Sequence, residues 1–124
     1  MKMKQYCLLA CSLLFSGFSR AQAPVIVSVS PIALSVEQYG KFEALIDLSV
    51  NPVNPYDYDE LRTEAIFTAP DGTSRTVDGF YMEDFTITNT NTGALSPSSV
   101  KGFRIRYSPA QTGIWSYTVR CVNA

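Results

Sequence analysis

Apolar and polar residues alternate in several short runs along the chain, which is the pattern of β-strands with one buried face. Helical periodicity is nearly absent. Alternating runs and short β-branched runs predict strands over residues 25–30, 41–50, 61–69, 74–80, 85–88, 102–107 and 114–122. About seven short strands separated by turn residues predict an all-β fold, an immunoglobulin-like or fibronectin-III-like antiparallel β-sandwich.

The same alternation predicts which side chains form the core. The residues expected to face inward are Phe42, Ala44, Ile46, Leu48 and Val50, then Thr63, Ala65, Phe67 and Ala69, then Phe103, Ile105 and Tyr107, and finally Trp115, Tyr117, Val119 and Cys121. Arg104 and Arg106 fall on the opposite side of their strand. We expect them to form a solvated strand face, paired with carboxylates across the sheet.

Turn residues separate the predicted strands. Pro70-Asp71-Gly72-Thr73 combines a proline preset for a turn with a glycine that tolerates positive φ, which predicts a hairpin. Residues 51–59, with two prolines, and residues 89–99, rich in Ser, Thr and Asn, are expected to be loops. Pro109 and Gly113 are expected to bracket a turn between two antiparallel strands.

Residues 1–23 have the layout of a secretory signal peptide. Two lysines come first, residues 6–18 are mostly apolar, and a small-x-small cleavage site ends at Ala23. The apolar stretch is shorter than the ~20 residues of a membrane-spanning helix. We therefore expect residues 24–124 to be one exported β-sandwich domain without a membrane span, secreted or periplasmic.

Leu8-Leu9-Ala10-Cys11 also resembles the lipobox of bacterial lipoproteins. Almost no apolar run precedes it, so lipidation at Cys11 is the less favoured alternative.

Charge and residue types exclude several classes of function. Without residues 1–23, the exported domain keeps seven of the ten basic residues against eleven acidic ones, a net charge of −4. No basic run marks a nucleic-acid-binding surface. The chain has no His, which removes the commonest general base and the commonest transition-metal ligand. We expect no enzymatic activity, no cofactor and no metal.

Cys121 is the one cysteine after residue 23, so no disulfide can form within the exported domain. We expect it to be buried as a small apolar residue, with an intermolecular thiol as the alternative.

Two groups of side chains are candidates for binding. Asp57, Asp59 and Glu60 alternate like calcium ligands, but the glycine turn of a calcium loop is missing, and a solvated loop is the favoured interpretation. Aromatic rings can stack on sugars, and the candidates at loop or strand-end positions are Tyr39, Tyr56, Tyr58 and Tyr81. The alternative is that these tyrosines close the ends of the sandwich with their hydroxyls in water.

Four segments together resemble a known family: "VEQYGKFEALIDL", "NPYDYDELRTEAIFTAPDGT", "DGFYM" and "FRIRYSPAQTGIWSYTVRC". Their order and spacing are similar to the immunoglobulin-like N-terminal domain, of unknown function, of secreted bacterial glycoside hydrolases of the apiosidase-like or collagen-binding type. The positions that carry the resemblance are Phe42, Phe67, Gly72, Phe80, Phe103, Tyr107, Pro109, Gly113, Trp115 and Tyr117.

In that family the domain precedes a TIM-barrel catalytic domain, for which residues 24–124 leave no room. The resemblance therefore implies a non-catalytic accessory domain that packs against or positions a glycoside hydrolase. The alternatives are an autonomous carbohydrate-binding module, with Tyr56, Tyr58 and Tyr81 as contacts, and a surface adhesion or interaction module.

Overall fold

The computed structural model describes residues 24–122. The predicted signal peptide and the alternative lipidation at Cys11 lie outside the described residues. The described chain forms seven strands and no helix: β1 (Ile26–Pro31), β2 (Phe42–Leu48), β3 (Arg62–Thr68), β4 (Ser74–Asp78), β5 (Phe80–Asn89), β6 (Ala94–Tyr107) and β7 (Ser116–Val122).

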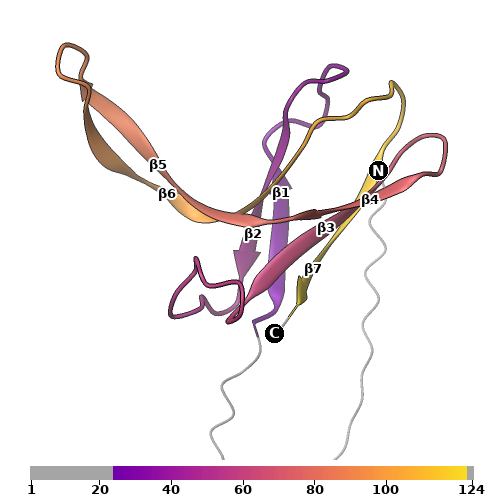
Figure 1. Ribbon diagram of the computed structural model, residues 1–124, viewed down its shortest axis with the longest axis horizontal. Helices are drawn as coiled ribbons and strands as arrows, with labels where there is room; N and C mark the ends of the chain where they lie inside the picture. Colours follow the sequence, from indigo (N-terminus) through magenta and orange to yellow (C-terminus); the bar gives the residue numbers. More distant parts are fainter. Residues whose placement is uncertain (1–23, 123–124) are drawn as a thin grey trace, which may run out of the picture.

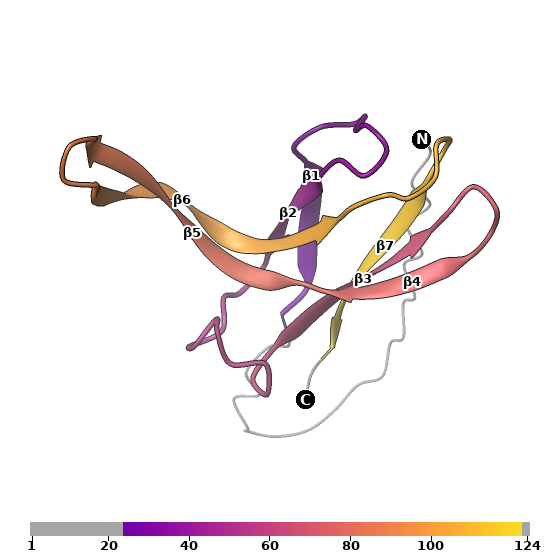
Figure 2. The ribbon, with the colours of Figure 1, turned by 45° about the horizontal axis from the view of Figure 1, so that its top comes forward.

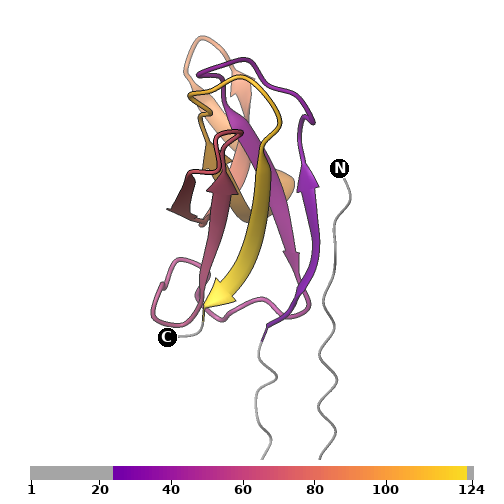
Figure 3. The ribbon, with the colours of Figure 1, turned by 90° about the vertical axis from the view of Figure 1, so that its right-hand side faces the viewer.

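The strands form two antiparallel sheets, which confirms the predicted β-sandwich (Figure 1 and, from the side, Figure 3). Sheet A has the order β1-β2-β6-β5, and sheet B has the order β4-β3-β7. Sheet A thus matches strands A, B, E and D of an immunoglobulin sandwich. In sheet B, β3 and β7 take the places of strands C and F, and β4 takes the place of the additional strand C′.

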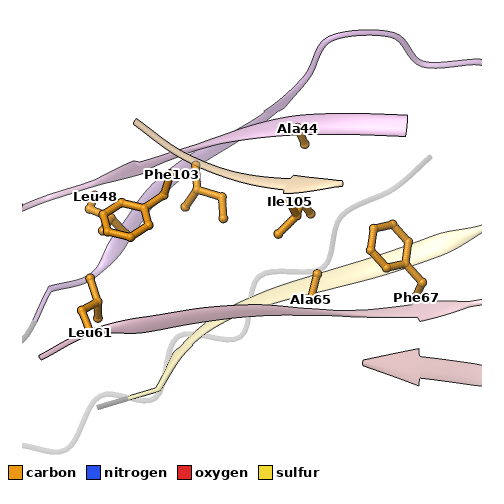
Figure 4. Close-up of a cluster of buried hydrophobic side chains, with 8 residues drawn as sticks. Ala44, Leu48, Leu61, Ala65, Phe67, Phe103 and Ile105 are labelled. Atoms are coloured by element: carbon orange, nitrogen blue, oxygen red, sulfur yellow. The ribbon is translucent and has the colours of Figure 1, made fainter. Parts of the chain in front are cut away.

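The core lies between the sheets and contains most of the side chains predicted to face inward (Figure 4). Phe67 is its centre: its ring lies 4.4 Å from that of Tyr107 and 5.8 Å from that of Phe42, centroid to centroid. Val50 was also expected to face inward, and that prediction is wrong. Its side chain is 48% exposed because β2 ends at Leu48, where the strand leaves the sandwich.

Residues 89–99 do not form the predicted loop. They belong to a long β5–β6 hairpin that projects beyond the sandwich and bends away from it (Figures 1 and 2). Its turn lies at residues 90–93, where Gly93 has a φ of 68° and the Asn89 side chain accepts hydrogen bonds from two backbone N–H groups. Both faces of this ribbon are exposed, so its polar residues resemble a loop in sequence although their backbones pair.

Residues 74–80 form two strands instead of the one that was predicted. β4 ends at Asp78 in sheet B, and β5 begins at Phe80 in sheet A, so the chain changes sheets at Gly79. A Cβ atom at Gly79 would lie 2.1 Å from Thr63 Oγ1. Only glycine fits where the two sheets approach this closely.

The segment from Pro109 to Gly113 also differs from its prediction. It joins β6 to β7, which lie in different sheets and do not pair, so it crosses the open end of the sandwich. Gly113 has a φ of 128°, and a Cβ atom there would lie 2.8 Å from Pro70 Cγ. The Trp115 indole N–H donates to the Gln111 carbonyl at 2.9 Å, which fixes the crossing against the start of β7.

Candidate functional site

The outer face of sheet A, away from sheet B, carries a cluster of charged side chains. Glu43 on β2 accepts a hydrogen bond from Arg104 at 2.9 Å and another from Arg106 at 2.7 Å, both on β6. Arg104 also donates to Asp84 on β5 at 2.7 Å. We call Glu43, Asp84, Arg104 and Arg106 the ion cluster. It ties three neighbouring strands together, and the predicted pairing of the arginines with carboxylates across the sheet is confirmed.

The prediction that both arginines are solvated is wrong for Arg104. Only 4% of this residue is exposed, as is also true of Glu43. Phe80 on β5 lies directly opposite Arg104 on β6. The centroid of the Phe80 ring lies 4.9 Å from the guanidinium carbon of Arg106, so the ring and this guanidinium group stack on each other. Neighbouring aromatic and charged side chains therefore cover a face that alternation alone would place in water.

Burial by itself raises the pKa of Glu43, but hydrogen bonds from Arg106 and Arg104 outweigh it, so the pKa lies below its ordinary value. The hydrogen bond to Asp84 raises the pKa of Arg104, although burial opposes it. Both carboxylate oxygens of Glu43 accept from arginines. The two buried charges at the centre of the cluster, Glu43 and Arg104, are therefore held in ion pairs.

Three of the four candidate tyrosines come together at one end of the sandwich. Tyr56, in the loop after β2, packs edge-on against Tyr81 of β5 with ring centroids 5.2 Å apart. The Tyr58 hydroxyl donates to the Gly79 carbonyl at 2.9 Å. Tyr56 and Tyr58 remain 63% and 49% exposed. Tyr39 lies at the opposite end, where its N–H donates to the Pro109 carbonyl, so it does not belong to this group.

The acidic residues of the same loop are used within the loop. Glu60 accepts hydrogen bonds from the backbone N–H groups of Val53 and Asn54 at 2.6 and 2.9 Å. Asp57 accepts from the N–H of Asp59 at 2.9 Å. These contacts fit the interpretation of a solvated loop. Nowhere in residues 24–122 do three or more His, Cys, Asp or Glu side chains gather as metal ligands would.

The projecting hairpin carries an exposed apolar face that the sequence analysis missed. Phe85 pairs with Pro97 and Ile87 pairs with Leu95, so these four side chains lie on one side of the ribbon. We call them the hairpin face. Phe85, Ile87 and Leu95 are 52%, 60% and 59% exposed, whereas the opposite side carries polar residues such as Thr86 and Ser96. The alternation of apolar and polar residues over 85–88 indicated that one side of this strand is apolar. Only the pairing with residues 94–97 shows that the apolar side chains form a continuous surface.

Cys121 is half-buried against the core, which is less than the full burial that we expected. Burial raises the pKa of its thiol, which lowers the fraction of reactive thiolate at neutral pH. The part of the chain that the structure describes contains no helix long and apolar enough to cross a membrane.

Comparison with known proteins supports one part of the resemblance, the membership of a domain family of unknown function. No curated protein and no solved structure matches the chain. One family model does, over residues 35–122, from the segment before β2 to the end of β7. That match spans more than half of the chain and includes every strand of the two sheets except β1. The chain therefore belongs to the family described as "Domain of unknown function (DUF5060)".

Proposed function

We propose that this chain is a non-catalytic accessory β-sandwich domain of an exported polysaccharide-degrading system, and that the hairpin face packs against a glycoside hydrolase catalytic domain. The observation that carries the proposal is the exposure of Phe85, Ile87 and Leu95 on one side of a ribbon that projects from the sandwich. Exposed contiguous apolar surface of this kind typically marks an interaction site. The resemblance of the sequence to domains that precede a TIM barrel supplies the kind of partner.

The amphipathic ribbon suits a contact between domains. One side carries the hairpin face, and the other carries Thr86 and Ser96, which remain hydrated. Contacts between domains typically bury ~600–1,500 Å². In this proposal the role of the domain is to hold or position the catalytic domain.

Site-specific photo-crosslinking tests this proposal. A photoreactive residue replaces Ile87 on the hairpin face in one protein and Thr86 on the opposite side in a matched control. Crosslinked polypeptides from the producing organism are then identified by mass spectrometry. We expect a glycoside hydrolase catalytic domain from the Ile87 position and none from the Thr86 position. Capture of no such domain at Ile87, or equal capture at both positions, contradicts the proposal.

A second candidate function is carbohydrate binding, which the gathering of Tyr56, Tyr58 and Tyr81 favours. Exposed rings at one end of a sandwich could stack on the apolar faces of sugar rings. Affinity electrophoresis in gels containing soluble polysaccharides tests this function. Retardation that Tyr56→Ala abolishes and Tyr39→Ala preserves would support it, because Tyr39 lies at the other end of the sandwich. Unchanged mobility in every polysaccharide would contradict it.

A further inference from the structure

The strand β7 lies at one edge of sheet B: among residues 24–122 it pairs with β3 on one side and with no strand on the other, although β1 of the facing sheet passes close to it (Figure 3). In an immunoglobulin sandwich this place, beside strand F, belongs to strand G. Among the described residues, no strand takes the place of strand G beside β7.

The orientation of the backbone groups along this edge follows from the hydrogen bonds of β3. The Thr63 carbonyl and the Ala69 N–H both bond on the side of β4. Backbone groups alternate in direction along a strand, so odd-numbered residues of β3 bond to β4 and even-numbered ones bond to β7. Each even-numbered residue of β3 pairs with an even-numbered residue of β7. The N–H and C=O groups of Tyr117, Val119 and Cys121 therefore point away from β3, along the open edge.

The other edge strands carry features that hinder pairing with another strand. β1 ends in Pro31 and has an irregular register near Ile26, and β5 has two such irregularities. β4 has only 5 residues. β7 has 7 residues in continuous register, without proline or bulge. Natural sheets protect their edges by short strands, prolines and bulges, and β7 has none of these.

The core is also incompletely covered beside this edge. The inward side chains of the central strand β3 are buried, with Thr63, Ala65 and Phe67 at most 3% exposed. The inward side chains of β7, from Tyr117 to Cys121, contact the same core but remain partly exposed. A further strand beside β7 with inward apolar side chains would cover them.

We propose that β7 pairs edge to edge with β7 of a second copy of this chain. The pairing is antiparallel, with its symmetry axis at Val119. It places Val119 opposite Val119 of the second copy and Tyr117 opposite Cys121 of the second copy. Every outward-pointing N–H and C=O group of these three residues then gains a partner. This inference goes beyond the proposed function and does not depend on it.

The side chains of β7 permit this arrangement. On the outer face, Thr118 of one copy lies opposite Arg120 of the other, so no like charges oppose each other. On the inner face, β7 of each copy takes the place of strand G for the other copy. It brings Tyr117, Val119 and Cys121 as inward side chains beside the partly exposed core. The two Cys121 residues are each two positions from the axis, so they lie ~14 Å apart along the strands at ~3.4 Å per residue. This exceeds the ~7 Å Cα separation that a disulfide spans, so the dimer forms without one.

Sedimentation velocity of the purified protein under reducing conditions, over a wide concentration series, tests the proposal. We expect a monomer–dimer equilibrium. Thr118→Arg places two like-charged pairs across the interface, and we expect the dissociation constant to rise about fivefold. Thr118→Glu places opposite charges there, and we expect the dissociation constant to fall. The control is Thr76→Arg, which makes the same change on the same face at the β4 edge, and we expect it to leave association unchanged.

Amide hydrogen exchange adds a residue-specific measurement. The N–H groups of Tyr117, Val119 and Cys121 should exchange more slowly as protein concentration rises, whereas that of Thr76 on the outer edge of β4 should not. A monomer at all concentrations, with rapid exchange at these three residues, overturns the proposal. So does an association that Thr118→Arg and Thr76→Arg change equally, or a dimer that disappears on reduction.

Discussion

Glu43 and Arg104 form an ion pair at 2.9 Å on the outer face of sheet A, and only 4% of each residue is exposed. Arg104 makes a second ion pair with Asp84 at 2.7 Å, and Glu43 makes a second one with Arg106 at the same distance. Arg104 therefore has two partners of opposite charge, and Glu43 has three, because Lys41 also lies 3.6 Å from its carboxylate. The pairs link β2, β6 and β5, and they favour the observed register of these strands over its alternatives.

Removal of one partner from the ion cluster should destabilise the fold strongly. Glu43→Gln leaves the buried Arg104 without one of its two opposite charges, the one that is itself buried, and we expect the free energy of unfolding to fall by about 3 kcal/mol. Urea denaturation followed by tryptophan fluorescence measures this. Asp47→Asn is the control, because Asp47 lies on the same face of the same strand but is exposed. Equal effects of the two substitutions would contradict a special role for the cluster.

The ion cluster also predicts how stability depends on pH. The pKa of folded Glu43 lies below its ordinary value of 4.5. Its contribution to stability is therefore complete well above pH 4.5 and is lost as the pH falls through the folded pKa. We expect denaturation curves recorded from neutral to acid pH to show this loss. The loss of stability at acid pH should be smaller in Glu43→Gln than in the unchanged protein. If the unfolding free energy depends on pH equally in both proteins, Glu43 is not the group responsible.

We expect the fold to become more stable when the hydroxyl group of Thr63 is removed. The residue is 1% exposed, and its Oγ1 atom has no hydrogen-bond partner among the described residues. Thr63→Val keeps the shape and removes an unsatisfied polar atom, so we expect a stabilisation of about 1 kcal/mol. Thermal and urea denaturation measure it. Thr68→Val is the comparison, because the Thr68 hydroxyl bonds to that of Ser74 at 3.0 Å, and we expect no gain there.

Truncation of an aromatic side chain should destabilise the fold more strongly where that side chain is more deeply buried. Phe67 is 3% exposed and contacts three other rings, so we expect Phe67→Ala to cost about 3–5 kcal/mol. Trp115 is only half-buried at the open end of β7, and we expect Trp115→Ala to cost about 2 kcal/mol. Urea denaturation followed by far-UV circular dichroism measures both. A larger loss from Trp115→Ala would mean that the end of β7 is more deeply packed than the structure shows.

Alternation predicted the strands wherever one face is buried. The runs that became β2, β3 and β7 were found within two residues, and their inward residues line the observed core together with Phe103 and Ile105 of β6. The predicted hairpin at Pro70–Thr73 was also found, and Gly72 there has a φ of 88°. Local chemistry was sufficient in these cases, because burial of one face and the conformation of a turn each leave a direct pattern in the sequence.

For the candidate surfaces, sequence reasoning supplied the residues but not their neighbours. It named Tyr56, Tyr58 and Tyr81, and it named the arginines of the ion cluster without Glu43 or Asp84. It treated residues 89–99 of the hairpin as a loop, because an exposed two-stranded ribbon needs no buried face and can carry the polar residues of a loop.

The sequence by itself determined the class of fold, the inward faces of the central strands and the absence of histidine, because each depends on residue type and local spacing. Tertiary structure alone decided that the chain changes sheets at Gly79, that Arg104 is buried, and that β7 has an open edge. These depend on which strands lie side by side, and contacts between residues far apart in the sequence leave no periodic signal along the chain.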